Sequence, residues 1–118
     1  MVWVALDADE VVGYCYASEV DDSLFVEEID VVPEHGRRGV GRALLRDVDA
    51  DVRRRALTAV TLTTESDVPW NRPLYEKLGF RVVAPDERHP GLAAKFTAEA
   101  DRGLDLTTRV TMRRDVSR

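Results

Sequence analysis

The chain is poor in cysteine, and its single cysteine, Cys15, excludes a disulfide within its 118 residues. No apolar run approaches the roughly 18 residues that cross a bilayer. The first ten residues carry acids where a secretion signal has a basic segment followed by an apolar one. We therefore expect a cytoplasmic protein, with Cys15 as a buried thiol in an apolar strand.

Histidine and lysine are also scarce. The two histidines, His35 and His89, have no spacing with other ligand types that is typical of a metal site, so no metal is expected. Two lysines stand against fifteen arginines, and the net charge of −5 argues against general binding of nucleic acid. The length is sufficient for one core and too short for two typical domains, so a single domain over residues 1–118 is expected.

The order of apolar periodicities predicts a mixed α/β fold. Residues 1–6 and 11–18 alternate as in a hairpin, and the next strand is expected to run antiparallel to them. A helix then crosses to a strand that should be parallel to its predecessor. The expected strands are 1–6, 11–18, 23–32, 59–65, 80–84 and 106–114, and the expected helices are 39–55, a short one before Gly79, and 91–103.

Residues 23–44 combine a strand, a proline, a glycine-rich turn and the start of a helix. Glycines at 39 and 41 let the backbone approach a ligand without a Cβ in the way. The first N–H groups of the helix have no partner within the helix and lie at the positive end of its dipole. Arg37, Arg38 and Arg42 add positive charge around the turn. The segment therefore predicts a cradle for a phosphate-bearing ligand, such as a pyrophosphate.

The two familiar nucleotide loops do not fit this segment. A Walker A loop ends in Gly-Lys-Ser/Thr, whereas Gly41 is followed by Arg42 and Ala43. The dinucleotide fingerprint requires a third glycine at the position of Leu44. An ordinary glycine turn entering a surface helix stays open as an alternative.

The same segment, Val-x-Pro followed by RRGVGRALL, resembles the acyl-coenzyme A loop of the GNAT superfamily of N-acetyltransferases. Gly39 and Gly41 match the two small positions of the family loop, whereas Gly36 stands where the family usually has Arg or Gln. The resemblance implies that the following residues bind the cosubstrate, acetyl-CoA: Val31, Val32, Arg37, Arg38, Gly39, Val40, Gly41 and Arg42.

A second segment, LYEKLGF at 74–80, resembles the family's second signature. The resemblance implies that Tyr75 stands beside the sulfur of the departing coenzyme A and gives it a proton. The family often has an asparagine about seven residues earlier. Position 68 is Val here, and the nearest candidate is Asn71, which we expect to contribute to binding of the cosubstrate. A tyrosine on a short helix also packs into a core, so that alternative stays open for Tyr75.

The resemblance further implies a mostly antiparallel sheet in which two central parallel strands splay apart, and transfer of acetyl to a primary amine. An amine with a pKa near 10.4 must lose a proton before it attacks. Glu27 and Glu28 are candidate bases on the strand at 23–32, and strand alternation predicts that they point to opposite faces. We favour Glu27 as the base, with Glu28 and Asp30 on the other face; exposed strand carboxylates are the alternative.

The chain lacks the strand and helices that normally precede its first strand in the family, so the resemblance describes an N-terminally abbreviated domain. We expect a homodimer to replace this missing wall, because the first strand would otherwise be an open sheet edge. An apolar surface on the 91–103 helix is expected to contribute, through Leu92, Ala93, Phe96 and Ala100. A catalytically silent acyl-CoA-binding module and a partner-dependent subunit remain alternatives to an active enzyme.

Overall fold

One six-stranded sheet organises the chain, with the strand order β1-β2-β3-β4-β6-β5. The computed structural model describes residues 1–35, 39–66, 68 and 71–117. The strands are β1 (Val2–Asp7), β2 (Glu10–Val20), β3 (Ser23–Val31), β4 (Ala59–Glu65), β5 (Arg81–Val83) and β6 (Arg109–Asp115). The α-helices are α1 (Val40–Arg54), α2 (Asn71–Lys77) and α3 (Pro90–Ala98), and the short 3-10 helices are η1 (Pro33–His35), η2 (Pro85–Glu87), η3 (Glu99–Arg102) and η4 (Leu106–Thr108).

The sheet confirms the predicted mixed topology, since the pair β3–β4 is parallel and the other neighbours are antiparallel. Two boundaries differ from the prediction by three residues or more, and the others agree within two. The last strand begins at Arg109, because Asp105 accepts hydrogen bonds from the Thr107 backbone N–H and hydroxyl and forms the turn η4. The helix predicted over 91–103 is α only to Ala98 and continues as η3 to its end at Gly103.

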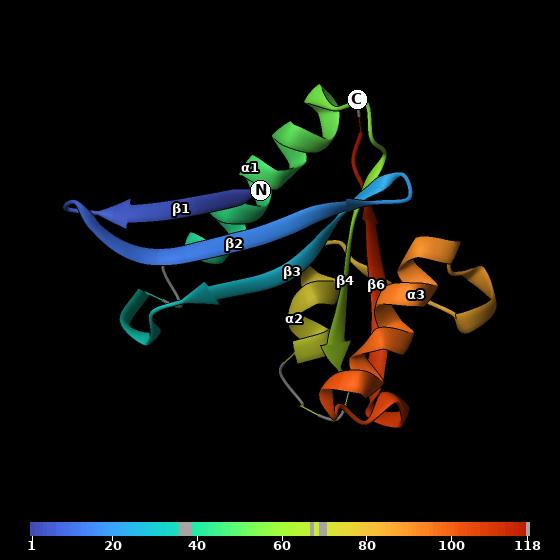
Figure 1. Cartoon of the computed structure of the whole chain (residues 1–118). Helices are drawn as coiled ribbons and strands as arrows, with labels where there is room; N and C mark the ends of the chain where they lie inside the picture. Colours follow the sequence, from blue (N-terminus) through green and yellow to red (C-terminus); the bar gives the residue numbers. More distant parts are fainter. Residues whose placement is uncertain (36–38, 67, 69–70, 118) are drawn as a thin grey trace.

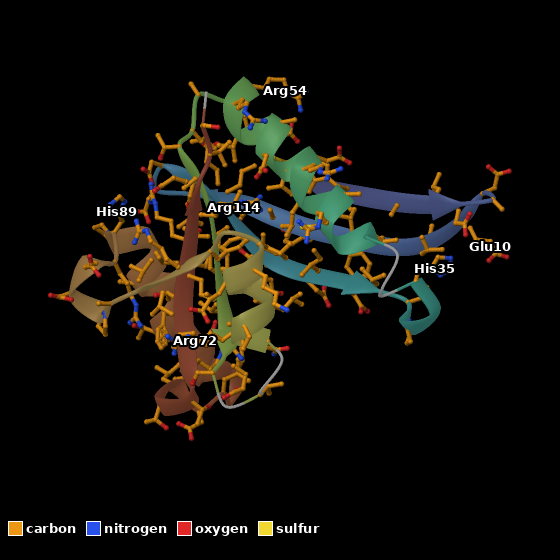
Figure 2. The ribbon with its side chains drawn as sticks, turned by 180° about the vertical axis from the view of Figure 1, so that it is seen from behind. Glu10, His35, Arg54, Arg72, His89 and Arg114 are labelled. Atoms are coloured by element: carbon orange, nitrogen blue, oxygen red, sulfur yellow. The ribbon has the colours of Figure 1, made fainter. Side chains whose placement is uncertain are left out.

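Helices cover both faces of the sheet. Helices α1 and α2 lie on one face and α3 on the other, as the two opposite views show (Figures 1 and 2). We call these the α1 face and the α3 face. Residues at helical spacing along α1 are buried against Cys15 and Ala17 of β2 and form the main core: Leu44, Leu45, Val48 and Val52.

The parallel strands β3 and β4 pair only at their beginnings. The register joins Ser23 to Ala59, Leu24 to Val60 and Phe25 to Thr61, and no later pair of the two strands is formed within the described residues. Beyond Phe25 the strands diverge, and α2 lies beside the opening (Figure 1). The sheet therefore forks next to Phe25, where main-chain groups of β3 are left without a β4 partner.

A β-bulge in β3 lies just past this fork. Tyr16 opposes Glu28 and Ala17 opposes Val26, so Glu27 is an extra residue in β3. Ser18 donates a hydrogen bond to Glu27, and Tyr14 hydrogen-bonds Glu28. Tyr14 and Ser18 lie on the same side of β2, so both carboxylates lie on the α3 face. The prediction that Glu27 and Glu28 point to opposite faces is wrong, because the bulge interrupts the alternation.

The exposed apolar surface is on the hairpin β1–β2 rather than on α3. Leu92 and Phe96 are buried, so the expectation of an apolar surface on α3 is wrong for these two side chains. The exposed large apolar side chains of the hairpin are Val2, Val4, Leu6, Val11 and Tyr16. Strand β1 is an edge of the sheet, as predicted. None of the described helices combines the length and apolarity needed to cross a membrane.

Candidate active site

A cavity of about 470 Å³ lies where the end of β3, the start of α1 and helix α2 meet. Its walls are contributed by Ile29, Asp30, Val31, Gly39, Gly41, Arg42, Leu45, Leu74, Tyr75 and Leu78. Apolar side chains dominate the walls, whereas the end at α1 presents backbone N–H groups and Arg42. This division suits an elongated ligand with an apolar part and an anionic part.

The start of α1 lacks the usual cap. Gly39 is the N-cap residue with φ 79°, a left-handed conformation that favours glycine, and it makes no side-chain capping bond within the described structure. The N–H of Ala43 donates to the Gly39 carbonyl, so the N–H groups of Val40, Gly41 and Arg42 precede the helical ladder. The first turn of α1 holds no acid, and Arg42 adds a cation at the positive end of the helix dipole. An anion in the cavity would stabilise this end.

Packing against the described residues does not explain why position 41 is glycine. It is the second residue of α1, and the cost of glycine relative to alanine there is at most the roughly 0.5–1 kcal/mol of a helix interior. A Cβ built at this position meets no described atom within 4 Å. Gly41 instead lines the cavity, where a Cβ would occupy space open to a ligand. The glycine therefore fits close approach of a ligand to the backbone better than packing within the chain.

Tyr75 lies on α2 at the opposite wall of the cavity. Its ring packs against the main core, and its hydroxyl has no hydrogen-bond partner among the described residues. Burial, and then the neighbouring Cys15, raise the pKa of Tyr75 above its usual value. The phenol is therefore protonated at neutral pH and can donate a proton or a hydrogen bond into the cavity.

Glu27 lies beside the fork on the α3 face and does not line the cavity. Its Oε1 accepts hydrogen bonds from Ser18 and from Lys95 of α3. Burial raises the pKa of Glu27, but the bonds from Lys95 and Ser18, with the charges of Lys95 and Arg102, outweigh it and hold the pKa below its usual value. Glu27 is ionised at neutral pH and binds an ammonium group.

The candidate residues from the sequence fall into three groups. The cavity brings together Val31, Gly39, Gly41, Arg42 and Tyr75. Outside its walls lie Val32, which is exposed after β3, Val40, which packs on the core, Asn71, which begins α2, and the carboxylates Glu27 and Glu28. Arg37 and Arg38 lie outside the described residues, so their predicted contact with phosphate stays a prediction.

Sequence reasoning missed five cavity residues. They are Ile29, Asp30, Leu45, Leu74 and Leu78. A signal for three of them was present, because Leu45 follows Gly41 by four residues and Leu74 precedes Leu78 by four, the spacing of one helix face. Leu74 is 52% exposed and lines the cavity, so part of its apolar surface is open to a ligand.

The other candidate sites, namely the thiol of Cys15, a metal site and a second cavity, have less support than the cavity at α1. Cys15 is fully buried, and burial raises its pKa to about 11, so it is a poor nucleophile. Within the described part of the chain, no three side chains of His, Cys, Asp or Glu lie together as metal ligands would. A second cavity of about 240 Å³ lies between β4, β6 and the start of α3, but its charged groups include the bidentate pair of Arg113 with Asp22. These two charges are already paired with each other within the chain.

Comparison with protein families gives a match over residues 1–82 to the acetyltransferase (GNAT) domain. Since this match covers more than half of the chain, it assigns the family. The matched residues include the glycine turn, α1, β4 and Tyr75 on α2.

Solved structures agree with this fold. An acetyltransferase of the GNAT family from Staphylococcus aureus Mu50 is 15% identical with a TM-score of 0.77, over 98% of this chain and 67% of that one. The PaiA N-acetyltransferase from Thermoplasma acidophilum, solved with coenzyme A, is 13% identical with a TM-score of 0.73. The match covers 98% of this chain and 60% of that one. A Bacillus anthracis protein solved with acetyl coenzyme A is 17% identical with a TM-score of 0.74. The match covers 97% of this chain and 61% of that one. The chain thus spans about two thirds or less of these structures.

Proposed function

Since the chain belongs to the GNAT acetyltransferase family, we propose that it transfers an acetyl group from acetyl-CoA to a primary amine. One observation carries the proposal: Gly41 lines the cavity at the uncapped start of α1, and no described atom lies close enough to require glycine there. The acceptor is a small molecule, an amino acid or a protein amine.

Acetyl-CoA fits the cavity as cosubstrate. The N–H groups of Val40, Gly41 and Arg42 suit its pyrophosphate, and the side chain of Arg42 adds charge. The apolar walls from Leu45, Leu74 and Leu78 suit its pantetheine arm. Structures with coenzyme A or acetyl-CoA bound, from Thermoplasma acidophilum and Bacillus anthracis, support the same assignment.

The fork of the sheet supplies the electrostatics of the transfer. Main-chain N–H groups of β3 beyond Phe25 have no β4 partner, so one of them can donate to the acetyl carbonyl and stabilise its developing negative charge. Tyr75, protonated because its pKa is raised, gives a proton to the departing thiolate. Glu27, on the opposite face beside the fork, takes a proton from the acceptor ammonium.

This arrangement brings the two reactants to the fork from opposite faces. The cavity with Tyr75 is on the α1 face, whereas Glu27 and its ammonium partner are on the α3 face. The catalytically silent module, our second candidate, would bind acetyl-CoA through the same cavity without turning it over. No observation favours it over the enzyme.

The experiment is an assay of thiol release from acetyl-CoA in the presence of a panel of primary amines, including amino acids, polyamines and short peptides. The active enzyme releases thiol with at least one amine and forms the acetylated product, identified by mass. Binding of acetyl-CoA without thiol release across the panel would assign the silent module. Absence of binding would contradict both.

A further inference from the structure

The ion pair between Lys95 of α3 and Glu27 places a primary amine of the chain at the proposed catalytic base. We propose that Lys95 is an internal acceptor, which occupies the place of the acceptor ammonium and is acetylated at Nζ when acetyl-CoA is bound without a competing amine. This inference rests on the proposed function, because it uses the same base and the same cosubstrate.

The position of Lys95 is fixed from two sides. Its Nζ and the hydroxyl of Ser18 donate to the same oxygen of Glu27, Oε1. The Nζ atom also lies 5.6 Å from the centroid of the Phe25 ring, within the range of a cation–π contact. Phe25 is the last β3 residue paired with β4, so the ammonium of Lys95 lies on the α3 face at the fork of the sheet.

The choice of lysine at this place is unusual for the chain. Of its seventeen lysines and arginines only two are lysines, Lys77 and Lys95. The other carboxylate pairs in the described part of the chain use histidine or arginine, as in Arg113 with Asp22 and Arg109 with Glu99. Arginine keeps its proton under all ordinary conditions, whereas lysine can become a neutral nucleophile. Lys95, the residue paired with the proposed base Glu27, can therefore act as a nucleophile once it has lost a proton.

The side chain is accessible as well as anchored. Lys95 is 38% exposed and Glu27 is 22% exposed, so the pair is neither sealed in the core nor free in solvent. An ion pair that is partly exposed in this way contributes little to stability. An external amine can therefore displace Lys95 from Glu27, and the ion pair does not prevent binding of another acceptor.

The chemistry of the step balances. Lys95 gives one proton to Glu27, which passes it to water, and the neutral Nζ forms a bond to the acetyl carbonyl carbon. The carbon–sulfur bond breaks, and the thiolate takes the proton of the Tyr75 phenol. The second proton leaving Nζ passes to solvent, and solvent restores the phenol proton. The products are Nζ-acetyl-Lys95, coenzyme A and one proton released to water.

The first test incubates the full chain with acetyl-CoA and no added amine, followed by intact mass measurement and peptide mapping. We expect first-order acetylation of Lys95 at a rate independent of protein concentration, and about 100-fold faster than that of Lys77. Lys95→Arg should remove this modification, Lys77→Arg should leave it unchanged, and Glu27→Gln should slow it by about the same 100-fold. Equal rates at Lys95 and Lys77 would overturn the inference.

The failure of this inference is distinguishable from failure of the proposed function. If the same preparation acetylates an external amine while Lys95 stays unmodified, the proposal that Lys95 is an internal acceptor fails and the proposed acetyltransferase function stands. Absence of transfer to any amine, with or without Lys95, would overturn both.

A second test needs no acetyl-CoA. Protein labelled with ¹³C at lysine Cε has two lysine signals, which Lys77→Arg assigns. Glu27→Gln and, separately, an added primary ammonium such as ethylammonium should each shift the Lys95 signal and leave that of Lys77 in place. A Lys95 signal unmoved in Glu27→Gln would overturn the ion pair on which the inference stands.

Discussion

Tyr75 packs edge-on against Phe80, with ring centroids 5.7 Å apart and ring planes at 77°. This geometry is a favourable aromatic arrangement, and Phe80 is itself buried in the main core. The ring of Tyr75 is thus held by packing, whereas its hydroxyl is left without a partner among the described residues. Packing and proton donation by Tyr75 can therefore be separated by a single substitution.

Tyr75→Phe should lower kcat and leave binding of acetyl-CoA nearly unchanged. The ring and its contact with Phe80 stay, and only the proton donor is lost. General acid catalysis contributes about 10²–10⁴-fold, which is the expected loss in kcat. The comparison is steady-state kinetics beside calorimetric titration with acetyl-CoA. Activity equal to that of the original chain would leave Tyr75 with a packing role alone.

Glu27→Gln should lower the rate of transfer by about 100-fold, whereas Glu28→Gln should change it little. Only Glu27 holds an ammonium group beside the fork; Glu28 is exposed and bonded to Tyr14. The two variants remove the same charge one residue apart, so each is the control for the other. A larger loss in Glu28→Gln would move the base to Glu28.

Asp22→Asn should destabilise the fold at neutral pH by about 1 kcal/mol, because the side chain is partly exposed and solvent weakens its bonds, and by less in acid. The bonds from Arg113, with that from Thr58, hold the pKa of Asp22 well below its usual range in the fold, against the opposing effect of burial. A carboxylate whose pKa is lowered by folding stabilises the fold above its unfolded pKa, near 3.9, and loses this contribution as the pH falls through its folded pKa.

The measurement for Asp22 is urea unfolding from pH 7 down to pH 3. The free-energy difference between the original chain and Asp22→Asn should shrink below about pH 4. Glu10→Gln, at the exposed start of β2 beside the hairpin turn (Figure 2), is the control and should have little effect at any pH. A difference for Asp22→Asn that stays constant with pH would contradict the assignment.

The exposed face of the β1–β2 hairpin should pair two copies of the chain. Strand β1 is the sheet edge, and its outer main-chain groups can pair with a strand of a second copy while Val2, Val4 and Leu6 cover apolar surface. Light scattering across a dilution series should give twice the monomer mass of 13.3 kDa. Val4→Glu should give the monomer, and Leu104→Glu, at another exposed apolar position, should leave the dimer intact. A monomeric original chain at all concentrations would contradict the pairing.

Local sequence patterns were sufficient for most of the fold. The apolar spacing of α1 and the alternation of β1 and β2 predicted their elements, because both are decided by which side of one element is buried. The cavity was predicted in part for the same reason: Gly39, Gly41 and Arg42 belong to one turn and the helix that follows it. Tyr75 came from the second signature.

Features decided by contacts distant in sequence could not be predicted in this way. The bulge at Glu27 depends on the register between β2 and β3, and it moved Glu27 to the side of Glu28. The partnership of Glu27 with Lys95 joins residues 68 positions apart. The burial of Leu92 and Phe96 depends on where α3 packs on the sheet, which its own spacing does not determine.

The most direct test of the account is the effect of acetyl-CoA on the unfolding of the original chain and of two variants at position 41. Acetyl-CoA at 100 times its Kd should stabilise the original chain by about 2.7 kcal/mol. Gly41→Ala should raise the stability of the free chain by up to about 1 kcal/mol and weaken binding. Gly41→Asp should remove the stabilisation by acetyl-CoA, whereas Ala50→Asp, exposed on the same helix, should retain it. Full stabilisation of Gly41→Asp would place the pyrophosphate elsewhere and contradict the glycine cradle.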